Sequence, residues 1–376
     1  VFEGDLDIER LVLAISAETG VSIEAENTLI IFDEIQEVPK ALTSLKYFHE
    51  NAPQYAIVAA GSLLGVALHQ GTSFPVGKVD FLDLYPLNFR EFLCAMGEKQ
   101  FVSMLDSCDT QMVTVFKTKY IERLREYYFV GGMPEVVKDF SEKKDYNRVR
   151  VIQKNLINYY QQDFSKHAEI KLVPRLNLVW NSIPMQLAKE NKKYIYGQVR
   201  EGSRAKDFEL AIQWLLDCGL IHKVQRIQKP DLPLKAYIDF DAFKLFLVDI
   251  GLLIAMTDLD AKVIIEGNKI FTEFKGALTE QYILQQLISD VGVIPYYYST
   301  QNSKGEIDFL VQGKTSVIPI EVKAEENLKA KSLKAFCEKY QPSYAVRTSM
   351  SDYREQDWMT NIPLYAIKWI ENYVNQ

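Results

Sequence analysis

The sequence predicts a multidomain α/β protein. Two short, continuously apolar segments, residues 28–32 and 55–60, are separated by a segment in which apolar residues recur at helical spacing. Strands that are apolar on both faces and alternate with helices indicate a parallel sheet covered on both sides. Later in the chain, residues 306–311 and 317–324 flank the turn sequence QGKTS and predict a β-hairpin.

Four regions follow one another along the chain. Residues 1–95 contain the two apolar strands, with helices predicted over DIERLVLAISAETG and ALTSLKYFHEN. Residues 96–170 are helical, with a break at the sequence GGMP, whose proline begins the next helix. Residues 171–260 combine helical segments with two short strands, and residues 261–376 contain a helix, the hairpin, a further helix and short strands.

Composition excludes several classes of protein. The net charge is −7, which argues against a general nucleic-acid binder, and no stretch of eighteen apolar residues predicts a membrane span. The four cysteines form no CxxC pair and the four histidines are scattered, which disfavours zinc sites and disulfides and is typical of a cytoplasmic protein. Because the chain begins without Met and without a signal pattern, we expect a fragment.

Two adjacent acids end the first apolar strand. Asp33 and Glu34 follow TLIIF at the edge of the sheet where open α/β sheets bind ligands. We expect Asp33 to bind Mg²⁺ and Glu34 to polarise an attacking water. Ser62, at the end of the second strand, would sense a γ-phosphate or position that water. The alternative is a solvated strand end before a helix, since acids also favour helix N-termini.

The sequence contains no loop of the kind that holds the phosphates of a bound nucleotide. GxxxxGK[ST] ought to precede the acidic strand, but only Gly4 and Gly20 lie upstream and the first lysine is Lys40. The sequence GTSFPVGK lies downstream, has five residues between its glycines, and contains a proline that removes an amide donor. The chain as given is therefore expected to bind ATP poorly or not at all.

Basic residues concentrate in one region. Residues 171–229 contain eleven Lys or Arg and five Asp or Glu, so this region carries +6 and the remainder −13. Local basicity in an acidic protein is typical of a nucleic-acid module. A helix, a short helix, a helix and a hairpin predict a winged helix-turn-helix. The side chains expected to meet DNA phosphates are Lys192, Lys193, Arg200, Arg204 and Lys206.

Other roles for this basic region stay open. Winged helices also bind proteins, and lysine-rich helix ends are commonly only solvated. The third helix itself carries Asp207, Glu209 and Asp217, whose negative charges would repel phosphate.

The predicted hairpin carries two acids and a lysine in the order Asp-x(n)-Glu-x-Lys. Strand alternation places Glu321 and Lys323 on one face, and burying such charges is costly unless they are paired or bind metal. In the PD-(D/E)XK nuclease pattern, Asp308 and Glu321 would hold Mg²⁺ and Lys323 would orient the water. Glu280, on the preceding helix, would add a further ligand. The alternative is a salt-bridge network on a fold without catalysis.

Several longer segments are more specific than these patterns. They are LIIFDEIQEVPKALTSLKYF, AAGSLLGVAL, SFPVGKVDFLDLYPLNFREFL and YYFVGGMPEVV. Through them almost the whole chain resembles a prokaryotic AAA-type ATPase family whose C-terminal domain is nuclease-like and of unassigned function. The resemblance implies a P-loop NTPase core that lacks its Walker A segment, a winged helix-turn-helix and a restriction-endonuclease-like α/β domain. It also implies that Asp33 and Glu34 are the Walker B acids and that Ser62 occupies the sensor position.

Three functions are compatible with the sequence. The first is an ATPase that in its complete form uses ATP and Mg²⁺ and couples the nucleotide state to DNA or to a protein partner. The second is a Mg²⁺-dependent DNA nuclease that acts through the C-terminal domain. The third is a non-enzymatic module that binds DNA or protein. A GxxxxGK[ST] motif in the reading frame upstream of Val1 would favour the first.

Overall fold

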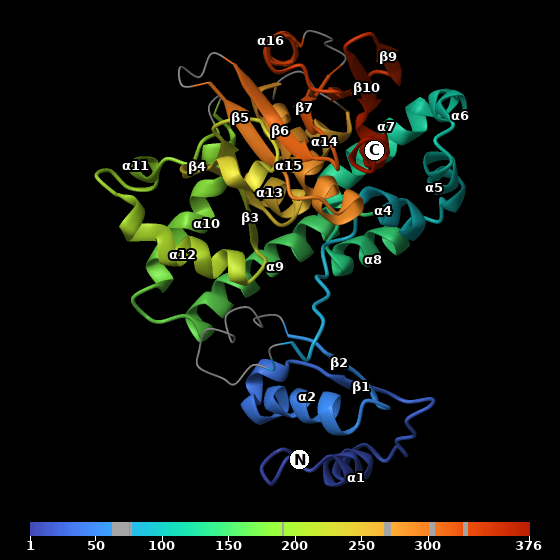
Figure 1. Cartoon of the computed structure of the whole chain (residues 1–376), viewed down its shortest axis with the longest axis vertical. Coiled ribbons are helices and arrows are strands. Elements are labelled where there is room, and N and C mark those ends of the chain that lie inside the picture. Colours follow the sequence, from blue (N-terminus) through green and yellow to red (C-terminus); the bar gives the residue numbers. More distant parts are fainter. Residues whose placement is uncertain (62–74, 76, 190–191, 267–271, 301–304, 326–329) are drawn as a thin grey trace. The chain divides into compact units, whose positions relative to one another are not determined.

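The computed structural model describes residues 1–61, 75, 77–189, 192–266, 272–300, 305–325 and 330–376. These residues form two compact units (Figure 1). One unit comprises residues 1–84 with 213–220, and the other comprises residues 85–212 with 221–376. Among the described helices, none has both the length and the apolar character that crossing a membrane requires.

The first unit is built on two parallel strands. Its regular elements are α1 (Ile8–Thr19), β1 (Leu29–Phe32), α2 (Pro39–Asn51) and β2 (Ala56–Ala59). Asp7 begins α1 by accepting a hydrogen bond from the Arg10 amide at 3.1 Å, and Pro39 occupies the first turn of α2. β1 and β2 pair in parallel, with Phe32 opposite Ala59. The predicted strands, helices and parallel pairing are therefore confirmed.

One face of this two-stranded sheet is covered, and the other is exposed in the part of the chain that the structure describes. Phe32 and Ile57 face the helices and join a cluster that includes the buried Leu11 and Phe48. The apolar side chains on the other face, with their exposed fractions, are Leu29 (54%), Ile31 (62%) and Val58 (49%). The expectation of a sheet covered on both sides is not met among the described residues, because burial alternates along both strands.

The second unit begins with a run of helices. They are α4 (Phe89–Ala95), α5 (Lys99–Asp106), α6 (Thr110–Val115), α7 (Lys117–Val130), α8 (Pro134–Lys143) and α9 (Tyr146–His167). Asn88 and Glu91 form a reciprocal capping box at the start of α4. The predicted helical region is confirmed, and so is its break: α7 ends before Gly131, and α8 begins at Pro134.

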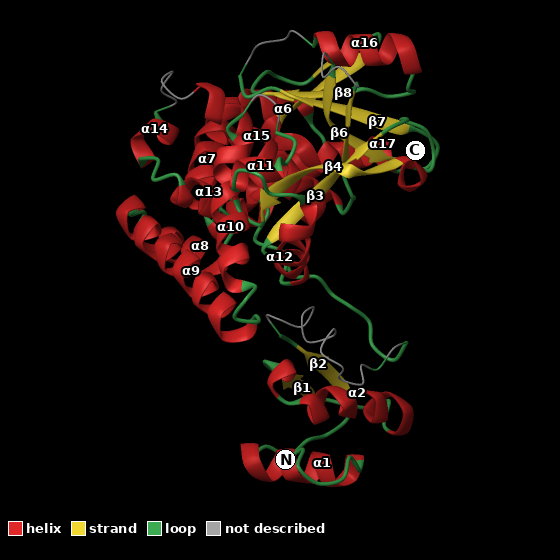
Figure 2. Cartoon of the chain, turned by 90° about the vertical axis from the view of Figure 1, so that its left-hand side faces the viewer, coloured by secondary structure: helices red, strands yellow, loops and turns green. Residues whose placement is uncertain are grey.

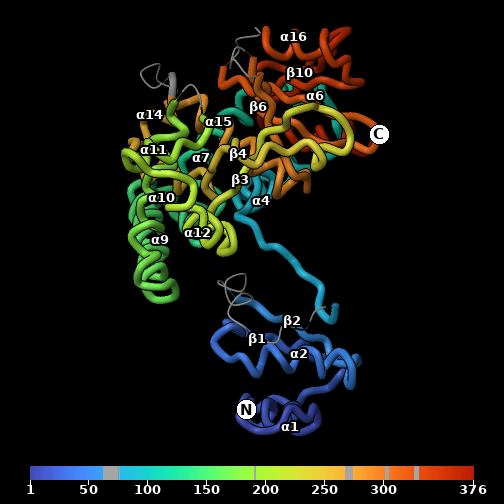
Figure 3. Tube along the Cα trace, turned by 60° about the vertical axis from the view of Figure 1, so that its left-hand side comes forward, coloured from blue at the N-terminus to red at the C-terminus, as the bar shows by residue number. Residues whose placement is uncertain are grey.

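The basic region contains the predicted order of elements. It comprises α10 (Val173–Leu187), the short α11 (Tyr196–Val199), α12 (Ala205–Asp217), β3 (Ile221–Ile227) and β4 (Ile238–Leu247). β3 and β4 pair antiparallel, as expected of a hairpin. However, β3 also pairs in parallel with a strand near residue 297, so the hairpin is part of a larger sheet. The boundary expected near residue 260 therefore separates two strands that the structure pairs. Figure 3 shows β3 and β4 in the same part of this unit as β6.

The remaining elements complete the second unit. They are α13 (Ile250–Met256), α14 (Ala261–Ile265), α15 (Thr272–Gln286), a π-helical turn (Leu287–Val291), β5 (Tyr296–Ser299), β6 (Glu306–Gln312), β7 (Val317–Val322), α16 (Lys331–Tyr340), β8 (Val346–Ser349), β9 (Arg354–Gln356), β10 (Met359–Pro363), a 3₁₀ helix (Leu364–Ile370) and α17 (Glu371–Val374). β6 and β7 form the predicted antiparallel hairpin, with Phe309 opposite Ile320. That expectation is confirmed.

The strands of the second unit form one mixed sheet. Its order among the described residues is β4-β3-β5-β6-β7-β8-β10-β9. Figure 2 labels β3, β4, β6, β7 and β8 among its strands. β7, β8 and β10 run parallel to one another. β5, β6 and β7 form an antiparallel meander, and β9 pairs antiparallel with β10. α15 contacts β7, and α16 contacts both β6 and β7. The sheet thus brings strands from residue 221 onward beside strands from residue 296 onward.

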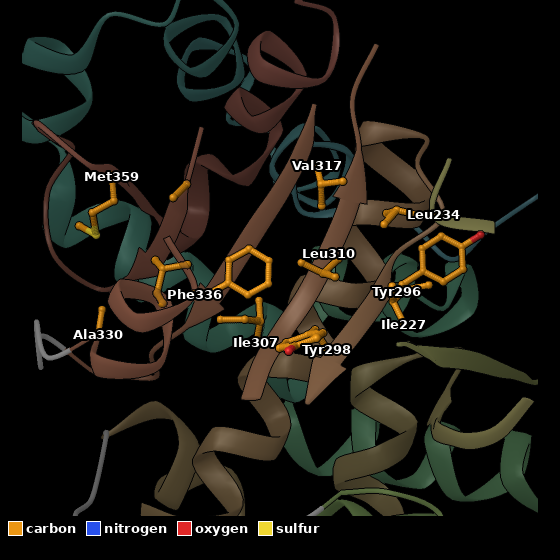
Figure 4. Close-up of a cluster of buried hydrophobic side chains, with 12 residues drawn as sticks. Ile227, Leu234, Tyr296, Tyr298, Ile307, Leu310, Val317, Ala330, Phe336 and Met359 are labelled. Carbon is orange, nitrogen blue, oxygen red and sulfur yellow. The ribbon is translucent and has the colours of Figure 1, made fainter. Parts of the chain in front are cut away.

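A cluster of buried apolar side chains packs on this sheet (Figure 4). Tyr298 lies against Phe336 of α16 at a ring-centroid distance of 5.4 Å. Other members shown in the figure include Ile227, Leu234, Tyr296, Ile307, Leu310, Val317 and Met359. The cluster joins β3, from the basic region, to the hairpin and α16.

The GGMP break is the centre of a buried polar network. Gly131 has a φ of 75°, and a Cβ atom on it would lie 2.2 Å from Oδ1 of Asp249. Asp249 is fully buried and accepts hydrogen bonds from the amides of Gly132 at 2.6 Å and Leu252 at 3.0 Å. Gln285 of α15 donates to the same carboxylate at 3.3 Å. The network ties α7, α13 and α15 together, which explains why this break requires glycine.

Candidate functional sites

The first candidate site lies where β1 and β2 end. The Ala60 amide donates to the Phe32 carbonyl at 2.8 Å, and the Ile35 amide donates to the Ala60 carbonyl at 3.1 Å. These bonds hold Asp33 and Glu34 beside the end of β2, at the carboxyl edge of a parallel pair. The predicted edge position of the two acids is therefore observed. Ser62, predicted for the same edge, lies outside the described residues.

A sharp turn presents the two carboxylates to solvent. Glu34 has a φ of 48°, an uncommon value for a residue with a side chain. Oδ1 of Asp33 accepts a hydrogen bond from the Glu34 amide at 3.0 Å, and Gln36 donates to Oε2 of Glu34. Both acids are exposed, whereas the next residue, Ile35, is buried and anchors the turn. Backbone strain of this kind often accompanies functional turns.

The chemistry of this edge fits part of a nucleotide site. Carboxylate oxygens are the ligands that Mg²⁺ prefers, and one acid beside such an ion can polarise a water. The groups that would hold phosphate, a run of backbone amides and a lysine, do not occur as a GxxxxGK[ST] motif in the sequence. The edge would therefore offer such a site only its two acids.

The second candidate site is a buried cluster of charges in the second unit, and Glu280 of α15 is at its centre. Glu280 is 5% exposed, and the two oxygens of its carboxylate face different lysines. Lys192 forms an ion pair with Oε1, and Nζ of Lys244 lies 3.7 Å from Oε2. Burial acts to raise the pKa of Glu280, but Lys192 and Lys244 outweigh it and hold that pKa below its ordinary value.

Lys244 links this acid to the hairpin. It is 1% exposed on β4, forms an ion pair with Glu306 of β6, and lies 4.8 Å from the ring centroid of Tyr297. Burial lowers the pKa of Lys244, but Glu306 and Glu280 more than reverse that effect and raise it. A buried ammonium ion is tolerated here because two carboxylates compensate it.

Asp308 completes the cluster. Its Oδ2 accepts a hydrogen bond from the Val322 amide of β7 at 2.7 Å. Burial and then the charge of Glu280 raise the pKa of Asp308 to about 7, against the opposing effect of Lys244 and Lys192. The cluster therefore contains three acids and two lysines, and the raised pKa of Asp308 lies near neutral pH.

Glu321 and Lys323 have other partners. Their side chains form an ion pair at 2.7 Å, and the second oxygen of Glu321 accepts a hydrogen bond from the Leu333 amide at the start of α16 at 3.0 Å. A carboxylate at a helix start is favourable because the helix dipole is positive there. The predicted pairing of the two acids with a lysine is thus observed for Glu321, but the hydrogen bonds of Asp308 and Glu321 go to different elements.

The residues described do not assemble these acids into a metal centre. No group of three or more His, Cys, Asp or Glu in that part of the chain has a geometry suited to a metal ion. Glu280 is engaged by lysines, and Glu321 by Lys323 and a helix start. The roles predicted for Asp308, Glu321 and Lys323 in a Mg²⁺ site remain predictions, and these ion pairs speak against them.

Lys244 is the functional-site residue that the sequence interpretation missed. A signal was present: AFKLFLV places one lysine in an otherwise apolar run of a strand. A charge in such a position must have a partner when it is buried. Its partner Glu306 lies 62 residues further along the chain, so local pattern could not identify it.

The basic region divides into buried and exposed charges. Lys192 was expected to meet phosphate, but its side chain is 13% exposed and its ammonium group contacts Glu280. Lys193 is half-buried. Arg200, Arg204 and Lys206 lie at the surface, as the prediction required. The structure therefore removes Lys192 from the set presented to solvent and leaves three of the five exposed.

Three family models match separate parts of the chain. Residues 3–93 match a model described as an AAA domain, and residues 121–263 and 275–367 match two domains of unknown function, DUF8612 and DUF4143. These matches support an AAA-type ATPase-like family. AAA-type domains generally use ATP and Mg²⁺. No curated protein matches the chain, and no solved structure matches it.

Proposed function

We propose that this chain is part of an ATPase in which the carboxyl edge of β1 and β2 supplies the catalytic acids. The observation that carries the proposal is the turn after β1, which holds Asp33 and Glu34 at the edge of a parallel strand pair within the segment that matches an AAA domain. Asp33 would bind Mg²⁺, generally through water, and Glu34 would orient and polarise the attacking water.

Nucleotide state would be read by a second part of the protein. The second unit would bind DNA or a protein partner, and its exposed Arg200 and Arg204 offer a surface for this contact. Coupling requires that bound nucleotide favour one arrangement of the acidic turn over another. The strained φ of Glu34 supports this part of the proposal, because the turn is a local feature that a ligand could stabilise or relax.

ATP turnover tests the proposal. The protein is expressed from a reading frame that includes a GxxxxGK[ST] segment before residue 1, and phosphate release is measured with Mg²⁺. Glu34→Gln should lower turnover by about 100-fold or more, the usual contribution of a positioned acid or base. Asp33→Asn should weaken the dependence on Mg²⁺.

The matched control is Glu37→Gln, which removes an exposed acid three residues further along the chain. This variant should retain the turnover of the unmodified protein. Absence of turnover in the complete protein, or turnover that Glu34→Gln leaves unchanged, would exclude the ATPase.

A second candidate is a Mg²⁺-dependent DNA nuclease in the second unit. The order Asp-x(n)-Glu-x-Lys favours this candidate, with Asp308 on β6, Glu321 on the adjacent strand β7 and Lys323 directly after β7. Incubation with plasmid and branched DNA, with Lys323→Ala as the control, tests this function. Equal cleavage by both proteins would indicate a contaminant, and cleavage lost only in the variant would favour the nuclease.

A further inference from the structure

The buried charge cluster brings together side chains from four places in the sequence. Lys192 precedes α11, Lys244 lies in β4, Glu280 lies in α15, and Glu306 and Asp308 lie in β6. The two lysines come from residues 171–260, and the three acids come from residues 261–376. The cluster is thus an electrostatic joint between these two parts of the second unit.

Both lysines are positioned by backbone that is fixed independently of the cluster. The Tyr194 amide donates to the Phe243 carbonyl of β4 at 2.8 Å, and the rings of these two residues stack. Gln186 exchanges two hydrogen bonds with the backbone of Ile195. These contacts hold the segment after Lys192 against the strand that carries Lys244. The two ammonium groups therefore reach the acids through built structure.

The lysines face the carboxylate oxygens that a metal ion would bind, and they supply the positive charge that it would supply. A divalent cation binds carboxylate oxygens at about 2.0–2.6 Å. Each oxygen of Glu280 already faces an ammonium group. Inside a protein, two positive centres this close repel strongly because water screens them poorly. A cation could bind Glu280 only if at least one lysine withdrew.

We propose that these residues form a lysine-filled centre: Lys192 and Lys244 take the place of a metal ion between Glu280, Glu306 and Asp308, and Lys192 fastens the basic region to α15. The centre is independent of metal in the folded protein. Lys244 is held within a strand of the sheet, whereas Lys192 lies outside regular structure. Lys192 is therefore the group whose removal converts the centre into a cation site.

Binding of Mn²⁺ tests this proposal directly. Free Mn²⁺ is measured by electron paramagnetic resonance during titration of the nucleotide-free full chain. Thermal unfolding is followed with and without Mn²⁺ or EDTA. In the unmodified protein these acids should bind no Mn²⁺ up to about 1 mM, the weak end of protein sites for divalent cations. The change in Tm on adding Mn²⁺ should be the same for the unmodified protein as for the Glu280→Gln and Asp308→Asn variants.

Lys192→Met should create the missing affinity. Loss of one positive charge should lower the Tm in EDTA and increase Mn²⁺ affinity by about tenfold or more. Mn²⁺ should then restore part of the lost Tm. Adding Glu280→Gln to this variant should abolish both the gain in affinity and the rescue. Lys193→Met, one residue away, should leave Mn²⁺ binding at the level of the unmodified protein.

Two results would overturn the proposal. One is a Mn²⁺ ion bound by the unmodified protein and lost in Glu280→Gln or Asp308→Asn. The other is a Lys192→Met protein whose Tm and Mn²⁺ binding equal those of the unmodified chain. If Lys192→Met does not fold, Lys192→Arg, which keeps the charge, should fold and bind no Mn²⁺. The measurement on the unmodified protein decides the question in either case.

Discussion

The molecule contains two acidic centres that differ in almost every physical respect. Asp33 and Glu34 lie on an exposed turn after β1, where the Glu34 amide donates to Asp33 and the Gln36 side chain donates to Glu34. Glu280 and Asp308 lie within the second unit, where lysines from distant segments compensate them. Identical carboxyl groups are therefore stabilised in different ways, and burial decides how.

The comparison shows that exposure decides whether a carboxylate is available to a ligand or is used within the fold. An exposed carboxylate stays charged at little cost and can meet a ligand from solvent. A buried one loses hydration, so it must be compensated by the protein itself and becomes part of the fold. Proximity of acids in sequence or along a hairpin is therefore a poor guide to a metal site until their compensating partners are known.

The largest expected effect on stability comes from removing Lys244 from the buried charge cluster. Lys244→Met leaves Glu306 and Glu280 without their shared partner, and removing one member of a buried ion pair costs about 3–5 kcal/mol. We expect the free energy of unfolding of the second unit to fall by that amount in urea titrations. Lys244→Met combined with Glu306→Gln should recover part of the loss.

The control for this change is Lys235→Met at the surface. It should alter the free energy of unfolding by less than about 0.5 kcal/mol. Equal effects of Lys244→Met and Lys235→Met would mean that the buried centre contributes nothing to the fold.

The next effect concerns the break between α7 and α8. Gly131→Ala places a methyl group against the Asp249 carboxylate and requires a left-handed backbone, so we expect a loss of about 2 kcal/mol or more. Chemical denaturation measures it. Gly276→Ala is the matched control because open space surrounds that site within α15. It should stabilise the protein by about 0.5–1 kcal/mol.

A smaller effect should appear as a dependence of stability on pH. The pKa of Asp308 is raised from 3.8 to about 7 by burial and by Glu280, so the folded state binds its proton more tightly than the unfolded state does. The stability from this group is fully present below about pH 4 and is lost as the pH rises through about 7. Val322, Lys192 and Lys244 oppose the shift and limit its size.

Asp308→Asn isolates this contribution from the other titrating groups. Relative to the variant, the unmodified protein should lose stability between pH 4.5 and pH 8, by more than about 1 kcal/mol. Parallel curves for the two proteins would show that Asp308 titrates normally.

The smallest effect on stability should come from the exposed basic residues. Arg200→Ala and Arg204→Ala are expected to change the free energy of unfolding by less than about 0.5 kcal/mol. If the region binds DNA, each removed phosphate contact should reduce the salt dependence of log K by about 0.9. Fluorescence anisotropy over a salt series measures this slope. An affinity that is independent of salt would instead point to a protein partner.

Local patterns predicted much of the fold. The hairpin of β6 and β7 follows from alternation and a turn sequence, and the parallel pair β1–β2 follows from two short apolar runs. The break at GGMP was visible because proline and glycine are local signals. Each of these features depends on residues within a few positions of one another.

The charge partners could not be predicted in the same way. Lys192 and Glu280 are 88 residues apart, and nothing near either residue names the other. The basic composition around Lys192 predicted a contact with DNA phosphate, yet its ammonium group forms an ion pair with Glu280. The second unit also joins β3 to β5 in one sheet. This pairing links two predicted domains, and the spacing of apolar residues within either strand does not indicate it.

The most direct test compares the two centres in one assay. ATP turnover and Tm are measured for Glu34→Gln and Glu280→Gln in the protein that includes an upstream GxxxxGK[ST] segment. The account predicts that Glu34→Gln loses turnover by about 100-fold with an unchanged Tm, whereas Glu280→Gln lowers the Tm and keeps turnover per folded molecule. Turnover that survives Glu34→Gln but is lost in folded Glu280→Gln would contradict it.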